Sequence, residues 1–145
     1  MSLEPRELDE SVHRDVTRLC AAGDELAEQG RYEEAVAEYN KAWELIPEPK
    51  TDWNASTWIL AAIADACFMI GKNKSARQAL ESAMTCPGGL GNPFLHLRLG
   101  QVLFDAGELD GAADDLMRAY MGGGPEIFEA EDPKYLTFLT TRATI

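Results

Sequence analysis

The chain has 145 residues, which is long enough for one sizeable hydrophobic core, and 46% of them are hydrophobic, which argues against disorder over most of its length. Its net charge of −12 at pH 7 has the opposite sign from what phosphate binding requires, so nucleic-acid binding is disfavoured. No apolar run approaches the roughly 20 residues of a membrane-spanning helix. The acidic first residues lack the apolar core of an export signal, so we expect a cytoplasmic protein.

Hydrophobic periodicity and helix-end signals predict seven helices and therefore an all-α fold. They are expected over about residues 5 or 8 to 29, 32–46, 53–70, 74–85, 93–106, 109–121 and 133–142. We expect Asp52 to cap the third helix, with Trp53 in its first turn, and Asp132 to cap the last one, with Pro133 at its first helical position. The glycine run at 122–124, followed by Pro125, is expected to end the sixth helix.

The six helices before this glycine run show one repeated frame of small residues. A glycine at 30, 71 and 107 is followed five residues later by an alanine and preceded seven residues earlier by a small residue. A second alanine comes seven residues after the first. The full set is Gly23, Gly30, Ala35 and Ala42, then Ala64, Gly71, Ala76 and Ala83, then Gly100, Gly107, Ala112 and Ala119. Small residues let two helices cross closely, and glycine ends the first helix in a left-handed turn, so each frame predicts a helix hairpin.

This frame resembles the tetratricopeptide repeat (TPR), whose signature runs W-x2-L-G-x2-Y, then A-x3-F, then P. The first repeat matches through Leu26, Gly30, Tyr32, Ala35 and Pro47. The resemblance implies a right-handed α-solenoid of three TPR hairpins in a single domain over residues 1–145. The repeats would cover about 16–49, 53–90 and 93–124, preceded by an extended N-terminal helix and followed by a capping helix at about 132–142. Tyr135, Leu136, Phe138 and Leu139 would cover the end of the last hairpin.

No constellation for catalysis, metal binding or cofactor binding stands out in the sequence. His13 lies on a polar helix, and His96 occupies a packing position, where a core or groove histidine is expected. The neighbouring acids Asp114 and Asp115 are interpreted as a solvated helix face. Cys20, Cys67 and Cys86 have no metal-ligand spacing, and we expect buried thiols at the first two. We therefore expect a binding protein that is not an enzyme and that needs no metal and no cofactor.

In TPR proteins the first helix of each hairpin lines a concave groove, and the resemblance carries that role to specific positions here. From the first repeat these include Thr17, Cys20, Ala21, Asp24 and Glu28. The residues we expect to bind a partner are Trp58, Asp65, Phe68, Met69, Phe94, Arg98, Gln101, Phe104 and Asp105. Exposed aromatic side chains accompanied by a few charges are typical of binding hot spots. The alternative is that one of the chain's own termini folds back over them.

The expected partner is a basic protein or peptide, because residues 1–50 of this chain carry 13 acidic and only 6 basic side chains. One TPR subfamily holds chaperone C-termini in a clamp of Lys, Asn, Asn, Lys and Arg; of the matching positions only Arg98 agrees, which disfavours that ligand. Segments around Trp43, Trp58 and Ile127 resemble small bacterial TPR proteins of polymorphic-toxin neighbourhoods, which implies an immunity protein or adaptor that neutralises a toxin. A general assembly scaffold or a self-associating module without a toxin partner is the alternative.

Overall fold

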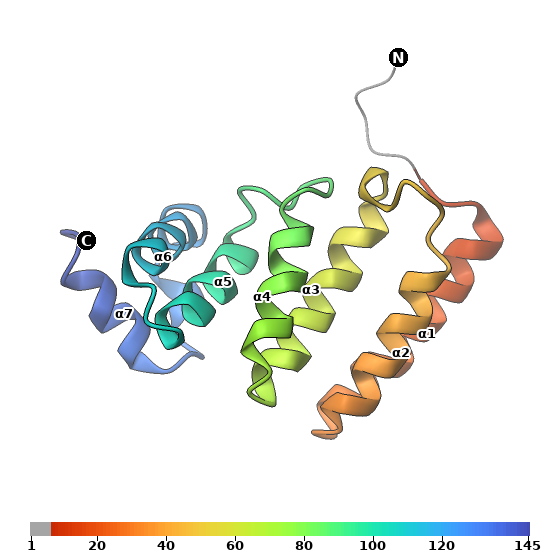
Figure 1. Cartoon of the computed structure of the whole chain (residues 1–145), viewed down its shortest axis with the longest axis horizontal. Coiled ribbons are helices and arrows are strands. Elements are labelled where there is room, and N and C mark those ends of the chain that lie inside the picture. Colours follow the sequence, from red (N-terminus) through yellow and green to blue (C-terminus); the bar gives the residue numbers. More distant parts are fainter. Residues whose placement is uncertain (1–6) are drawn as a thin grey trace, which may run out of the picture. The chain divides into compact units, whose positions relative to one another are not determined.

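The computed structural model describes residues 7–145, and these form seven α-helices and two short 3-10 helices without a β-strand (Figure 1). In chain order they are α1 (Glu10–Glu28), α2 (Tyr32–Glu44), η1 (Lys50–Asp52), α3 (Asn54–Met69), α4 (Asn73–Ala83), α5 (Pro93–Asp105), α6 (Leu109–Gly123), η2 (Pro125–Phe128) and α7 (Pro133–Thr140). The chain divides into two compact units. Unit 1 ends at Leu90 and contains α1 to α4, and unit 2 spans Gly91–Ile145.

Small side chains sit at every helix crossing, as the sequence frame predicts. The seven alanines of the frame have no exposed surface. A Cβ atom added to Gly23 would lie 2.5 Å from the ring of Tyr39, and one added to Gly100 would lie 2.7 Å from Leu116. Since these distances are far below van der Waals contact, the helices of the first and third hairpins can pack as they do only with glycine at these places.

The turn inside each hairpin is a left-handed glycine turn. Gly30, Gly71 and Gly107 have φ angles of +77°, +77° and +80°, where only glycine is unstrained. The residue after each glycine donates its backbone N–H to a carbonyl five residues back, as in the 2.9 Å bond from Arg31 to Leu26. This bond satisfies a carbonyl that the helix end would otherwise leave without a partner, so the predicted helix ends are confirmed.

Two predicted helix starts in unit 1 are wrong. The first helix begins at Glu10 and not at Leu8, while the alternative start at Pro5 lies outside the described residues. Asp52 does not cap α3, because the segment before that helix closes into the separate turn η1. The ammonium group of Lys50 holds this turn by donating to the carbonyls of Trp43 and Ile46, at 2.8 Å each.

The glycine run ends α6 later than predicted. Gly122 and Gly123 are helical, and the helix stops only at Gly124, which has a φ of +73°. A Cβ atom on Gly123 would lie 2.7 Å from Ile127, so the missing side chain admits a neighbour and does not break the helix. The chain then forms η2, which the sequence did not predict, before α7 begins with Asp132 accepting from the Lys134 N–H at 3.0 Å.

The C-terminal helix α7 covers apolar surface of unit 2. Tyr135 and Leu139 are buried, and Phe138 packs on Phe104 of α5 with ring centroids 5.0 Å apart. From η2, Phe128 is also buried and lies 6.3 Å from the ring of Tyr120. The C-terminal helix α7 is therefore the capping helix that the sequence predicted. Within residues 7–145, none of the helices combines the length and apolar character needed to cross a bilayer.

Candidate functional site

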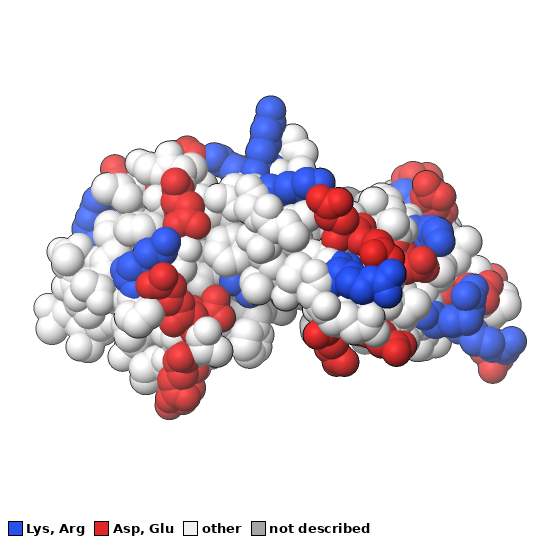
Figure 2. Space-filling model, turned by 90° about the horizontal axis from the view of Figure 1, so that it is seen from below, with Lys and Arg blue, Asp and Glu red and all other residues white. Residues whose placement is uncertain are grey.

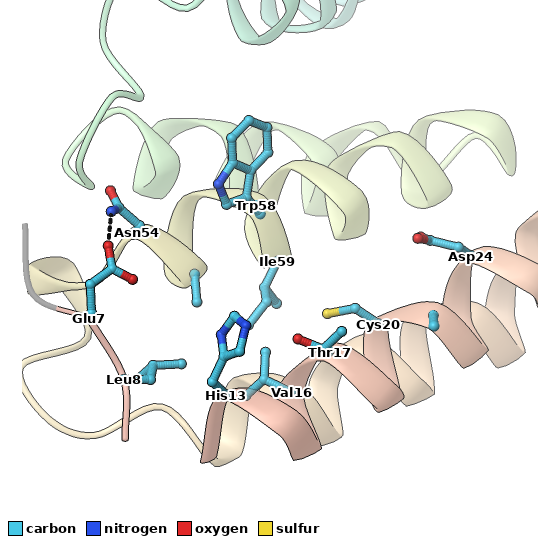
Figure 3. A pocket seen from close by; sticks show the side chains of 12 residues that line it. Glu7, Leu8, His13, Val16, Thr17, Cys20, Asp24, Asn54, Trp58 and Ile59 are labelled. Carbon is cyan, nitrogen blue, oxygen red and sulfur yellow. Dashed lines mark hydrogen bonds between the residues drawn. The ribbon is translucent and has the colours of Figure 1, made fainter. Parts of the chain in front are cut away.

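Unit 1 has a pocket of about 680 Å³ between α1 and α3 (Figure 3), which we call the anchor pocket. Its lining residues are Glu7, Leu8, His13, Val16, Thr17, Cys20, Ala21, Asp24, Asn54, Ala55, Trp58 and Ile59. Four of the groove residues carried over from the repeat, Thr17, Cys20, Ala21 and Asp24, lie in this pocket together with Trp58. Its volume is in the range of pockets that bury a large side chain or a small ligand.

The anchor pocket has an apolar floor and an exposed aromatic edge. Val16 and Ile59 are buried beneath it, since both belong to the hydrophobic core of unit 1. Trp58 stands on α3 with 68% of its surface exposed, and Figure 3 shows the indole above the pocket. An indole in this position can cover an incoming apolar group while its N–H remains able to donate.

The end of the pocket nearest the N-terminus is formed by a contact that brings distant parts of the chain together. The Asn54 side-chain amide donates to Glu7 Oε1 at 2.9 Å, and Leu8 packs against the hydrophobic core of unit 1. These residues and His13, whose ring lies over the middle of the pocket in Figure 3, were not predicted from the sequence. Glu7, Leu8 and His13 precede the first repeat, and Asn54 lies at the start of the second repeat, outside the positions that the repeat assigns to the groove.

A second hollow of about 360 Å³ shares Asp24 with the anchor pocket, and we call it the acidic hollow. It is lined by Asp24, Ala27, Glu28, Tyr32, Tyr39, Ala62, Asp65, Ala66 and Met69. Two of the predicted binding residues, Asp65 and Met69, lie here, and Met69 is 55% exposed. Three carboxylates from two helices therefore face a hollow whose lining contains no Lys or Arg within the described part of the chain.

Asp24 is oriented from behind by a residue of the second helix. The Tyr39 hydroxyl donates to Asp24 Oδ1 at 2.6 Å. Burial and this hydrogen bond to Asp24 raise the pKa of Tyr39, so the hydroxyl keeps its proton and donates at any physiological pH. Burial, followed by the Asp24 charge, also raises the pKa of the Cys20 thiol, which disfavours a reactive thiolate in the pocket.

In unit 2, Arg98 and Gln101 are held by a residue from the segment between η2 and α7. Arg98 donates to Glu131 Oε1 at 3.0 Å and to Gln101 Oε1 at 2.7 Å, and the Gln101 amide donates to the same Glu131 oxygen at 2.7 Å. Gln101 is fully buried. Because Glu131 already supplies a carboxylate to Arg98, the one position that agrees with the chaperone-tail clamp has an internal partner.

Phe104 and Asp105 also contact the C-terminal helix. Phe104 meets Tyr135 edge-on at 5.5 Å between ring centroids, and Asp105 accepts from the Tyr135 hydroxyl at 3.0 Å. Lys134 lies 3.6 Å from the Asp105 carboxylate. The remaining predicted residues differ in exposure: Phe94, at the start of α5, is 66% exposed, and Phe68 on α3 is half-buried. Within unit 2, the chain's own C-terminal segment thus contacts four of the five residues predicted to bind a partner.

His96 is a core residue with both ring nitrogens engaged. The Gly91 backbone N–H donates to Nε2 at 2.9 Å, so the ring proton is assigned to Nδ1, which donates to Asp115 Oδ1 at 2.8 Å. The interpretation of Asp115 as a solvated acid is therefore wrong, because its side chain is only 13% exposed and is paired with His96. Burial raises the pKa of Asp115 despite the opposing effect of His96.

Of the predicted buried thiols, Cys67 is buried, whereas Cys20 is half-buried at the anchor pocket. Cys86 is buried as well. Over residues 7–145, no three His, Cys, Asp or Glu side chains are grouped so that they could hold a metal ion. The arrangement that the structure offers is therefore a surface with an apolar pocket, an exposed indole and carboxylates along one side.

Comparison with known proteins agrees with the repeat frame. Residues 17–86 match the family described as tetratricopeptide repeat. The second TPR domain of human RPAP3, solved with the HSP70 peptide SGPTIEEVD, superposes with a TM-score of 0.67 at 19% identity, covering 90% of this chain and 96% of that one. This chain has a TPR fold. No curated protein sequence matches it significantly.

Two further solved structures share the TPR fold at low identity. The Yersinia enterocolitica type III secretion chaperone SycD, in complex with a peptide of the translocator YopD, has a TM-score of 0.70 at 15% identity, with 92% of this chain and 95% of that chain covered. The Sgt2 TPR domain from Aspergillus fumigatus has a TM-score of 0.66 at 18% identity, with coverages of 97% and 80%. At this identity the likeness establishes the fold, and TPR domains of this fold bind peptides in two of the three structures.

Proposed function

We propose that this chain is a non-catalytic protein-binding module that captures a protein or peptide partner on the α1/α3 face of unit 1. The observation that carries the proposal is the anchor pocket, in which an apolar floor lies beside a Trp58 side chain that is 68% exposed. An indole left in water costs solvation free energy that burial against a partner recovers, and such residues dominate binding energies. The peptide complexes of RPAP3 and SycD support the same use of the fold.

The other predicted binding residues contribute in different ways. Asp65 and Met69 belong to the acidic hollow next to the anchor pocket, and Phe68 precedes Met69 on α3. Phe94 offers a second exposed ring, 66% accessible, at the start of α5. Arg98, Gln101, Phe104 and Asp105 already contact Glu131 or α7, so we assign them a smaller share of the affinity.

The proposed partner is basic, and a toxin is the class of partner that we favour. The charge of the chain supports a basic partner. With 25 acidic and 13 basic residues the chain has a net charge of −12, which speeds its association with a basic protein. Toxins that act on nucleic acids carry basic surfaces, so an acidic, compact binder has the character of an immunity protein or adaptor. The resemblance of segments around Trp43, Trp58 and Ile127 to TPR proteins of toxin neighbourhoods led to this proposal.

A general assembly scaffold or a self-associating module is the second candidate. Exposed apolar side chains outside the α1/α3 face favour it, namely Leu90 at 71%, Met121 at 79% and Phe94. The two candidates differ in what is recovered with the protein from its source cell: one dedicated basic partner in equal amount, or several proteins or a second copy of this chain. Affinity capture followed by mass spectrometry distinguishes them.

The test of the binding face uses the partner recovered in that way. Trp58→Ala should weaken binding by about 2 kcal/mol or more, because it removes the aromatic edge of the anchor pocket. Surface plasmon resonance measures the loss, and circular dichroism checks that helicity is kept. Met121→Ala, which removes a similarly exposed side chain from unit 2, is the matched control and should bind as the wild type does. Equal binding by both variants would contradict the proposed face.

A further inference from the structure

Asp24 is the residue at which the anchor pocket and the acidic hollow meet. It lines both, whereas the other carboxylates of the acidic hollow, Glu28 and Asp65, line only that hollow. Figure 3 shows Asp24 on α1 at the opposite end of the pocket from Glu7. A partner whose apolar side chain enters the anchor pocket can therefore bring a neighbouring residue to Asp24.

The carboxylate of Asp24 is held in place and still open to an incoming donor. Tyr39 binds one oxygen, Oδ1, at 2.6 Å from behind, while Asp24 itself is classed among the exposed residues. Tyr39 is only 3% exposed, and its ring packs where Gly23 leaves space, so its hydroxyl is fixed by the hairpin core. A fixed acceptor loses less conformational entropy on binding than a free side chain does.

From these contacts we infer that Asp24, held by Tyr39, makes the α1/α3 face select a protein segment in which Lys or Arg lies close in sequence to a large apolar anchor. This inference rests on the proposed function and names the chemistry of the partner at that site. Asp24 would touch the cation, and Tyr39 is a positioning residue. Charge complementarity supports the choice of occupant, because no Lys or Arg lines either hollow among the described residues.

The spacing between anchor and cation follows from the helix geometry. Val16, beneath the pocket, and Asp24 are separated by eight positions on α1, which corresponds to about 12 Å along the axis. An extended peptide advances about 3.3 Å per residue, so the cation should lie about three or four residues from the anchor. An acidic side chain at that position would face the Asp24 charge and would be rejected.

The experiment uses synthetic peptides of about twelve residues with a central Trp in a Gly/Ser background. Three versions carry Arg, Ser or Glu at the positions three and four residues from the Trp, on either side. Each is titrated into the full-length, ¹⁵N-labelled protein, and the Trp58 indole N–H and α1 and α3 amides are followed by NMR. The Trp58 signal is identified by its loss in Trp58→Phe. We expect the Arg peptide to bind about tenfold more tightly than the Glu peptide.

Three variants distinguish a specific effect of Asp24 on peptide selectivity from the effect of the protein's net charge. Asp24→Asn should remove the preference for Arg over Ser, whereas Glu25→Gln, the same change at the next, exposed position outside both hollows, should retain it. Tyr39→Phe removes only the hydroxyl and should reduce the preference, with circular dichroism confirming that the fold is kept. If Asp24→Asn and Glu25→Gln lost the preference for the Arg peptide to the same extent, the inference would be overturned, because the preference would then depend on net charge.

The remaining outcomes separate the inference from the proposed function. If all three peptides shift the Trp58 indole with equal affinity, the selection by Asp24 is refuted while the binding face stands. If shifts appear only in α2 and α4, both are refuted. Absence of any shift with the Arg peptide at millimolar concentration also overturns the inference. In that case the binding face is still tested independently, by asking whether the wild type captures the cellular partner and whether Trp58→Ala fails to do so.

Discussion

At the scale of single residues, the hairpin crossings leave no room for a larger side chain. Ala35, Ala76 and Ala112 each have an exposed fraction of 0%, and each lies near the start of the second helix of its hairpin. Extra methyl groups at such a crossing must push the two helices apart or force strained rotamers. These positions were predictable from the sequence, because the same small residue recurs at the same place in three repeats.

We expect Ala35→Leu to lower the free energy of unfolding by about 1–3 kcal/mol through overpacking. Urea denaturation followed by circular dichroism measures the change. Ala37→Leu is the matched control, because Ala37 is an exposed position on the same helix, and its stability should stay close to that of the wild type. If both variants were equally stable, close packing at the crossing would not be what requires alanine.

A second residue-scale feature could not be predicted, namely the buried pair of His96 and Asp115. His96 and Asp115 lie 19 positions apart on different helices. Asp115 directly follows the exposed Asp114, so in the sequence these two acids resemble a solvent-exposed pair. Only the packing of α5 on α6 reveals that Asp115 turns inward. Its pKa is raised by burial, which means that the ionised carboxylate is disfavoured in the folded state.

This pair gives a pH prediction with a definite sign. A group whose pKa is higher when folded contributes stability at low pH, and that contribution is lost as the pH rises through the folded-state pKa. Relative to Asp115→Asn, which keeps an acceptor for His96 Nδ1, the wild type should therefore become less stable as the pH rises. Asp115→Ala, which leaves that N–H without its acceptor, should cost about 1–3 kcal/mol. Chemical denaturation across the acidic pH range measures both.

Asp114→Asn serves as the control, because Asp114 is exposed and accepts from Arg118 on the surface at 3.2 Å. This variant should lose less stability than Asp115→Ala does, because an exposed ion pair contributes little. A pH profile of Asp115→Asn that ran parallel to that of the wild type would refute the role assigned to the Asp115 charge.

At the scale of elements, α7 stabilises unit 2 by burying apolar side chains against its neighbours. Leu139 has no exposed surface, although the helix that carries it has only eight residues. Such a short helix has little stability alone, so its packing must hold it in place. Leu139→Ala should reduce the free energy of unfolding by about 2–5 kcal/mol, whereas Thr137→Ala, at an exposed position of the same helix, should have little effect. Thermal and urea denaturation provide the comparison, and equal stability of the two variants would show that α7 is dispensable.

The helix ends that a single local residue determines were predictable from the sequence. The helix ends that depend on contacts with other segments were not. Glycines at 30, 71 and 107 end their helices because a left-handed residue is needed there. The turn η1, by contrast, depends on Lys50 reaching back to the end of α2, and α6 continues to Gly123 because Ile127 packs against it. Contacts of this kind come from folding and have no local signature in the sequence.

At the scale of the whole molecule, the dominant property is the excess of acidic residues. On the face drawn in Figure 2, charges of both signs are interspersed with uncharged surface. Long-range attraction should therefore come from the summed charge, whereas affinity should come from local contacts such as those of Trp58. The sign of the charge was readable from the sequence, and the positions carried over from the repeat include four residues that line the anchor pocket, but the end of the pocket with Glu7, Leu8 and Asn54 was not predicted.

Raising the salt concentration from about 0.05 to about 0.5 M should slow association with a basic partner several-fold and change the dissociation rate much less, because salt screens charges that are not in contact. Surface plasmon resonance separates the two rates. An association rate that did not respond to salt would indicate that the net charge of −12 serves solubility alone.

The packing of Tyr39 in the space left by Gly23 has a consequence for attempts to transplant this face onto another repeat scaffold. Copying the exposed residues of α1 and α3 would carry over Trp58 and Asp24 but would leave the Asp24 side chain free to rotate. A graft that keeps the original orientation must also take the tyrosine from the second helix and the glycine that admits it. The proposed surface of α1 and α3 can thus be transferred intact only together with α2, because Tyr39 and Gly23 lie inside the core.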